Sequence, residues 1–302
     1  MAYLQQAFGM LGLYSGTIPP TIFPMNPLNV TFRRSLLTLG VLCALGLGGE
    51  PCAEATEVVG PPLLQVPQAV VRPTMTAAVN DPAWTTAAVI RALGPAINHQ
   101  RTVDQVLPPT TVRLLWDADF LYVRCEATDA EIYLPFKEHD ADLYRGDVAE
   151  VFLDTVGDAR QYFELQVSPN NATLDQNILM TASEAHSTDD RRLVEEIFTR
   201  NLWFDRSYTM TGLRSAASIQ PAGWIAEFAI PAESALHRLG QKQWKAGQSI
   251  RANVLRYEWQ LEQGEKATAG KRGLIAMNWA PVMEGCPHLS PQAMGTLELV
   301  GK

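Results

Sequence analysis

Residues 112–123 read VRLLWDADFLYV, and this stretch decides the fold class. Apolar side chains occupy alternate positions in both halves, as Val112, Leu114 and Trp116 do in the first. Alternation with a period of two is typical of a half-buried strand. The central Asp-Ala-Asp consists largely of turn-forming residues. The stretch therefore predicts an antiparallel hairpin, with strands over residues 111–116 and 120–126.

The same period of two recurs through the C-terminal two thirds of the chain. Further strands are expected at residues 147–154, 161–168, 224–230, 249–259 and 295–300. One helical turn is expected at 234–239, where Gly240 can close it. So many strands with so little helix predict an all-β fold, an antiparallel β-sandwich of jelly-roll or immunoglobulin-like type.

Charge and tryptophan are unevenly distributed along the 302 residues. There are 24 lysines and arginines against 32 aspartates and glutamates, so the formal net charge is −8. Proteins that bind nucleic acid are generally basic, so this balance disfavours a nucleic-acid partner. All seven tryptophans lie between Trp84 and Trp279, while residues 1–49 carry only Arg33 and Arg34 as charged residues. The chain therefore has two unlike parts.

The N-terminal part has the pattern of a secretory signal peptide. The basic pair Arg33-Arg34 precedes an apolar run at 36–47, and Ala53-Glu-Ala55 follows as a cleavage motif. A membrane-spanning helix needs about 20 apolar residues, so this shorter run favours a cleaved signal over residues 1–55. An uncleaved N-terminal anchor is the alternative, and Met25 is an alternative true start.

The rest of the chain is expected to form one exported domain. Residues 56–66 contain Gly60-Pro-Pro62 and are interpreted as a linker, and residues 67–302 as a single domain without a membrane span. A signal peptide implies the periplasm, the cell surface or the extracellular medium as its location. Cleavage leaves Cys125 and Cys286, which could form one disulfide or remain two separate thiols.

The polar faces of two predicted strands suit a ligand with many hydroxyl groups. On 120–126 and 161–168 these faces carry tyrosine, arginine, glutamate and glutamine, including Arg124. Such groups can make paired hydrogen bonds and offer an aromatic surface to a sugar ring. An ordinary solvated sheet face is the alternative.

Several motifs, in order, resemble the family 9 carbohydrate-binding modules and their relatives. The hairpin at 112–123 resembles the first hairpin of that family, and Tyr144-Arg-Gly-Asp147-Val-Ala-Glu150-Val-Phe-Leu-Asp154 resembles its "W-x-x-D-x-V-E-x-F-x-D" strand. The remaining similar segments are Asn80–Ala87, Asp129, Gln161–Val167, Gly223–Pro231, Asn278-Trp279 and Met294–Leu299. The resemblance covers residues 79–300 and implies a β-sandwich that binds sugars without cleaving them, in support of polysaccharide breakdown.

The resemblance also implies a set of sugar-binding residues. Tyr144 takes the place of an aromatic residue that stacks on the sugar, and Glu150 that of a hydrogen-bonding carboxylate. Asp147 matches the neighbouring aspartate, with tying down a loop as its alternative role. Gln166 and Ser168 match polar contacts on the next strand.

The second aromatic position departs from the family pattern. A gapless count places His288 where the family has tryptophan, and Trp279, Trp203 or Trp259 could substitute for it. The imidazole ring of His288 offers less stacking area than an indole. Arg124 is a further candidate for hydrogen bonds to sugar hydroxyls.

Catalysis is disfavoured because no pair of carboxylates suits a glycosidase. Asp147 and Glu150 are three residues apart on a strand, so they point to opposite faces. A glycoside hydrolase remains an alternative, as does a haem-binding electron carrier that uses His288 with Met283 or Met294. Calcium is a candidate ligand for the acidic stretch 126–158, with ordinary solvated acid as the alternative.

Overall fold

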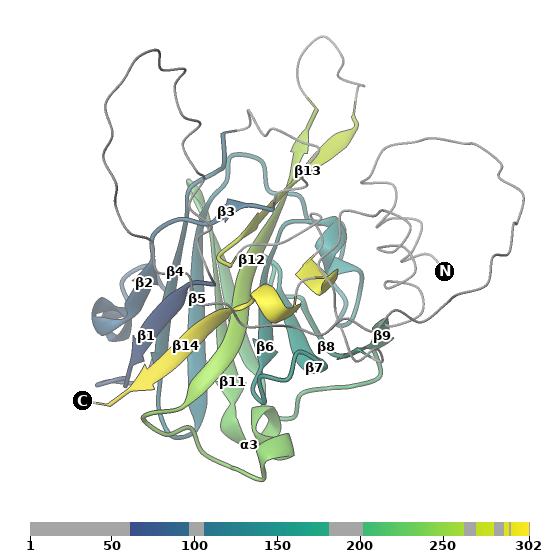
Figure 1. Cartoon of the computed structure of the whole chain (residues 1–302). Coiled ribbons are helices and arrows are strands. Elements are labelled where there is room, and N and C mark those ends of the chain that lie inside the picture. The colour runs from purple at the N-terminus through teal and green to yellow at the C-terminus, as the bar shows by residue number, and fades with distance from the viewer. Residues whose placement is uncertain are drawn as a thin grey trace, which may run out of the picture. The chain divides into compact units, whose positions relative to one another are not determined.

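Two mainly antiparallel sheets pack face to face in the computed structural model (Figure 1). The structure describes residues 61–96, 106–180, 202–262, 270–280, 287–289 and 291–301, within a compact unit that covers Gly60–Lys302. The expected signal peptide, residues 1–55, lies outside the described residues. No helix in the described ranges has the length and apolar character needed to cross a membrane.

The larger sheet has nine strands, in the order β1-β14-β12-β6-β7-β8-β9, and β13 joins β12 to the short β3. Its strands are β1 (Leu63–Pro67), β3 (Gly94–Pro95), β6 (Val148–Asp154), β7 (Gln161–Val167), β8 (Thr173–Met180), β9 (Leu202–Asp205), β12 (Ser249–Leu261), β13 (Arg272–Asn278) and β14 (Gly295–Val300). β1 pairs with β14 in parallel, and the other pairs in this sheet are antiparallel.

The smaller sheet has five antiparallel strands in the order β10-β11-β5-β4-β2. They are β2 (Ala88–Ile90), β4 (Thr110–Trp116), β5 (Phe120–Thr128), β10 (Arg214–Gln220) and β11 (Gly223–Pro231). The short helices are η1 (Pro82–Thr86), η2 (Leu143–Arg145), α3 (Ala232–Ala235), η3 (His237–Leu239), η4 (Pro287–Leu289) and η5 (Pro291–Ala293). The described chain therefore confirms the predicted all-β sandwich with little helix.

The main core lies between the sheets and is built from alternate residues of their strands. Val112 and Ala226 of the smaller sheet and Val151 and Leu165 of the larger sheet belong to one buried cluster. Trp84, Trp116 and Trp224 are also buried, which agrees with a structural role for these three tryptophans: Trp116 and Trp224 belong to the main core, and Trp84 packs in a smaller cluster with Leu115 and Tyr122. The alternation read from the sequence thus shows which side chains face the core between the sheets, although the outward side chains of β6, β7 and β11 are mostly buried as well.

The predicted linker at 56–66 is wrong over its last residues. Leu63–Pro67 forms β1, and Val66 within it is fully buried in the main core. This strand has only five residues and prolines next to it on one side and at its end, so local sequence carries almost no strand signal. Its pairing with β14, more than 200 residues away, is what makes it a strand.

Candidate functional site

A row of polar side chains crosses the outer face of the larger sheet. Ala149 and Val151 of β6 face the core, so Glu150 between them faces outward. In register, Glu150 lies opposite Gln166 of β7, and Glu164 of β7 lies opposite Gln176 of β8. Four polar side chains from three adjacent strands therefore meet on one face.

These four side chains are joined by hydrogen bonds. The Nε2 amide of Gln166 donates to Oε1 of Glu150 at 2.7 Å and to Oε1 of Glu164 at 2.8 Å. Nε2 of Gln176 donates to Oε2 of Glu164 at 2.6 Å. All four are at most 1% exposed. Both amide nitrogens of this network therefore donate to carboxylate oxygens.

Several acceptors on this face have no hydrogen-bond partner in the described part of the chain. They are Oε2 of Glu150, Oε1 of Gln166, Oε1 of Gln176 and Oδ1 of Asn278. Asn278 of β13 lies opposite Leu255 of β12, which in turn lies opposite Glu150, so all four atoms belong to the same face. A buried acceptor without a donor costs about 1–3 kcal/mol. These acceptors therefore match a ligand that brings O–H or N–H donors, and because their side chains are buried, such a ligand reaches them only when the groups that cover them move.

The charge on this face is negative and has no strong counter-charge. Burial, and then the neighbouring charge of Glu164, raise the pKa of Glu150 well above its usual range. Among described residues the nearest cationic group to Glu164 is His288, whose Nε2 lies 3.6 Å from Oε2. Burial lowers the pKa of His288, so near neutral pH this imidazole is uncharged. Glu150 consequently takes up a proton at a higher pH than an exposed glutamate does.

An aromatic pair lies next to the polar row. Leu143 of η2 packs on Val148 and Leu174 of the same outer face, which brings Tyr144 there. The Nε1 group of Trp259 donates to the backbone oxygen of Tyr144 at 3.0 Å. Both aromatic residues are partly exposed, and burial raises the pKa of Tyr144 to about 12. The face thus combines orphaned acceptors with aromatic surface.

A second carboxylate cluster, Asp129, Asp147 and Glu258, is fully buried. Asp147 accepts hydrogen bonds from the backbone N–H groups of Tyr133 and, at 2.7 Å, Trp259. Burial raises its pKa to about 7, although these two bonds oppose the shift. Arg256 ion-pairs with Glu258 and lies 3.8 Å from Asp129. The cluster thus contains its own cation and ties loop to strand.

Comparison with known proteins identifies the fold family. The family model described as carbohydrate family 9 binding domain-like matches residues 76–302. The chain belongs to this family. No curated protein sequence matches significantly.

Solved structures of similar fold come from two bacteria. A family 9 carbohydrate-binding module of Caldicellulosiruptor kristjanssonii, in complex with cellotriose, is 16% identical with a TM-score of 0.50, and the match covers 80% of this chain and 94% of that one. The same kind of module from that organism in complex with glucose is 15% identical with a TM-score of 0.51, covering 79% and 96%. A putative carbohydrate-binding protein of Bacteroides uniformis is 12% identical with a TM-score of 0.53, covering 80% and 100%. At these low sequence identities, the similarity shows a shared fold and nothing more specific.

Three of the residues suggested by the family 9 resemblance come together. Glu150 and Gln166 are in direct contact, and Tyr144 borders the same face. Asp147 faces away from Glu150 and ties a loop, as its alternative role predicts. Ser168 closes the β7–β8 turn, where its Oγ donates to the backbone oxygen of Ala172 and accepts from its N–H.

Arg124 does not lie on the outer face of the larger sheet. It lies on β5 in the other sheet, where its Nη1 contacts Oε1 of Glu227 at 2.8 Å. The two side chains are 1% and 0% exposed, and Arg124 also donates to the backbone oxygen of Ala78. The two polar strand faces that suggested one hydroxyl-binding surface belong to opposite sides of the sandwich, so their combination was wrong.

His288 lies beside Glu164 of the polar row, but its ring packs against other side chains of the protein. Its ring centroid lies 4.9 Å from Phe152 and 5.0 Å from Phe204, and its Nδ1 lies 2.9 Å from the hydroxyl of Tyr162. The side chain is only 7% exposed, so it does not serve as an open stacking surface. Both ring nitrogens face protein groups, which disfavours the haem alternative.

Trp279 and Cys125 have structural surroundings. A Cβ on Gly295 would lie 2.6 Å from the Trp279 ring, so that ring covers the start of β14. Cys125 is a free thiol within the main core, where burial raises its pKa to about 12. Cys286 lies outside the described residues. Among the proposed substitutes for the second aromatic position, Trp259 is the one in contact with Tyr144.

Sequence reasoning missed Glu164, Gln176 and Asn278. Glu164 shares the polar alternation of Gln166, so the pattern contained its signal. Gln176 lies on β8, whose residues do not alternate cleanly. Asn278 becomes relevant only through the register of β13 on β12.

Proposed function

We propose that this domain binds carbohydrate at the outer face of its larger sheet and does not cleave it. The observation that carries the proposal is the row of buried acceptors without donors on Glu150, Gln166, Gln176 and Asn278. Sugar hydroxyls supply donors at short spacing, and the aromatic residues beside the row offer an apolar surface for a sugar ring. Membership of the family 9 binding domains supports the same reading.

Absence of cleavage is part of the proposal. Glu150 and Glu164 share one amide donor, so their carboxylates lie side by side. A glycosidase needs two carboxylates on either side of the scissile bond. The described network instead uses the pair to accept hydrogen bonds.

The ligand class to test first is a β-linked glucose oligomer. Related modules were solved with cellotriose and with glucose, which are equatorial sugars with dense hydroxyl groups. Calorimetry with cello-oligosaccharides, followed by an array of plant and algal glycans, measures the affinity directly. Failure to bind any of them at millimolar concentration overturns the proposal, and release of reducing sugar that Glu150→Gln abolishes would replace it with hydrolysis.

Tyr144→Ala should weaken oligosaccharide binding by at least about tenfold, because the aromatic ring beside the polar row would be lost. The melting temperature should not fall, because the side chain is partly exposed. Ile219→Ala is the control, because Ile219 is 56% exposed on β10 of the smaller sheet, away from the proposed site. The affinity of the control should not change. An unchanged affinity in Tyr144→Ala removes this residue from the site.

We also propose that the domain is exported and assists polysaccharide breakdown outside the cytoplasm. The support is the arrangement of a basic pair, an apolar run and an Ala-x-Ala motif in residues 33–55. Mass spectrometry of protein recovered from the periplasm or medium should find an N-terminus at Thr56. Recovery of the uncleaved chain in a membrane fraction would favour the anchor.

A further inference from the structure

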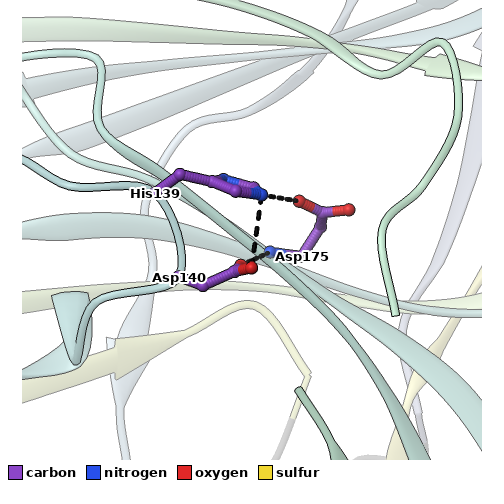
Figure 2. A group of neighbouring side chains, drawn as sticks. All are labelled: His139, Asp140 and Asp175. Atoms are coloured by element: carbon purple, nitrogen blue, oxygen red, sulfur yellow. Dashed lines mark hydrogen bonds and ion pairs between the residues drawn. The ribbon is translucent and has the colours of Figure 1, made fainter. Parts of the chain in front are cut away.

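Three metal-ligand side chains converge at the edge of the larger sheet, beside β8 and apart from the polar row. Figure 2 shows His139, Asp140 and Asp175 directed toward one another. Nε2 of His139 lies 3.3 Å from Oδ2 of Asp140 and 3.5 Å from Oδ1 of Asp175. β9 pairs only with residues 177–180 of β8, so the first half of β8 is free to contact the loop that carries His139.

The imidazole of His139 is oriented by the strand that it contacts. Its Nδ1 lies 3.0 Å from the backbone oxygen of Thr173 and 2.9 Å from the Thr173 hydroxyl. The backbone N–H of Asp140 donates to the same carbonyl at 2.9 Å. An Nδ1–H bonded to a carbonyl leaves the Nε2 lone pair for a metal, as is usual for metal-bound histidines. Here that lone pair points at two carboxylates.

Asp175 supplies a carboxylate from a buried side chain whose Oδ1 faces His139. The side chain is 3% exposed, and its Oδ2 accepts from the backbone N–H of Met210. No lysine or arginine in the described ranges pairs with Asp175. A buried carboxylate in this position needs a positive charge to offset its desolvation.

The distances within the cluster can be compared with two possible sources of that charge, and all three ligand atoms lie within 4.8 Å of one another. A charge-assisted hydrogen bond from an imidazolium would be about 2.7–2.9 Å long, and both observed distances exceed this range. In a tetrahedral zinc site with bonds of about 2.0–2.1 Å, neighbouring ligand atoms are about 3.4 Å apart. The observed separations of 3.3 and 3.5 Å match that edge.

We propose that His139, Asp140 and Asp175 bind a divalent transition-metal ion of the zinc class. Calcium and magnesium prefer sets of oxygen ligands only, whereas an imidazole with two carboxylates suits zinc. His139 is about half exposed, which leaves a side of the ion open to water or a further donor.

Such an ion would join the loop before β6 to β8. Asp142 in this loop is already held by Arg206 at 2.7 Å, and Tyr144 follows two residues later in η2. The ion would therefore add a second contact that holds the loop carrying Tyr144, by linking this loop to β8. The metal site itself does not rest on the proposed sugar binding, so either one can fail alone.

Zinc titration of the chelator-treated full chain tests the proposal. Competition with a chromophoric zinc indicator should reveal one site in the wild type, weakened at least about tenfold in His139→Ala. His237→Ala is the matched control, because His237 is also exposed and its Nδ1 lies near the backbone oxygen of Ser234. The control should keep the site. Millimolar calcium should not displace the zinc.

Asp140→Asn is the second variant, since Asp175 also supports the backbone of Met210 and its substitution could unfold the edge. It should lose zinc while its circular dichroism spectrum stays unchanged. Zinc should raise the melting temperature of the wild type but not of His139→Ala or Asp140→Asn. Absence of zinc binding by the wild type overturns the proposal, as does equal binding by wild type and His139→Ala.

Discussion

Glu150 is a buried carboxylate beside a second one, Glu164, with one amide between them. Its Oε2 lacks a donor, and burial raises its pKa. Such an arrangement lowers the stability of the fold, because desolvation and like charge both act against ionisation. Groups that cost stability in this way are common at binding sites. At the residue scale, the unfavourable burial of the Glu150 carboxylate is therefore the strongest sign of a binding function.

Glu150→Gln should raise the free energy of unfolding by about 1 kcal/mol while weakening oligosaccharide binding about tenfold. Glutamine keeps an acceptor for Gln166 and can donate to Glu164, so the like charge disappears. Urea denaturation and calorimetry measure the two effects. Glu298→Gln, on β14, should change neither. Loss of stability in Glu150→Gln would mean that the carboxylate is structural.

The pairing of β1 with β14 is the feature of note at the element scale. The N–H of Thr296 donates to the backbone oxygen of Pro62 at 2.8 Å, and β1 runs parallel to β14 from there. The Trp279 ring lies directly over Gly295 at the start of β14. Glycine is needed here because a Cβ atom would overlap with both the Trp279 ring and the backbone oxygen of Pro62.

Gly295→Ala should lower the free energy of unfolding by about 2 kcal/mol. Its Cβ would lie 2.6 Å from the Trp279 ring and 2.9 Å from the Pro62 oxygen, so a rigid group must move. Gly301→Ala is the control at the other end of the strand, since its Cβ would make an ordinary contact of 3.5 Å. Chemical denaturation compares the two. Equal stability of both variants would show that Trp279 moves aside without cost.

Across the whole molecule, burial of acids sets the response to pH. The pKa values of several carboxyl groups are raised by burial; they are Asp147, Glu150, Asp154, Asp175 and Glu258. The folded protein then binds more protons than the unfolded chain, so stability falls as pH rises toward the folded pKa. His288 has a lowered pKa and acts in the opposite direction below about pH 6.5.

The free energy of unfolding should therefore be higher at about pH 6.5 than at about pH 8. Asp147, with a pKa of about 7, accounts for about 1 kcal/mol of the difference. Urea denaturation at the two pH values measures it. Asp147→Asn should reduce the difference, because asparagine does not titrate. A wild-type stability that rises with pH over this interval contradicts the assignment.

Much of the fold could be predicted because strand alternation is a local property. β4, β5, β6, β7, β11, β12 and β14 were expected within one or two residues of their observed bounds, and the opposite orientations of Asp147 and Glu150 followed from strand geometry. The buried roles of Trp84, Trp116 and Trp224 were expected from the same patterns. The order of the motifs along the chain also predicted the family. These inferences need only a window of a few residues, since successive strand side chains alternate between core and solvent.

Assembly of the sites was decided by the tertiary structure. Arg124 and Glu150 both lie on polar strand faces in the sequence, yet strand pairing places them on different sheets. Only the register of the strands brings Gln176 and Asn278 to the face that carries Glu150. His139 and Asp175 likewise meet through a loop folded onto β8. The physical reason is that strand pairing depends on contacts between distant segments, whose burial and register no short window records. The sequence determined which side chains face outward; the pairing of strands decided which of them face one another.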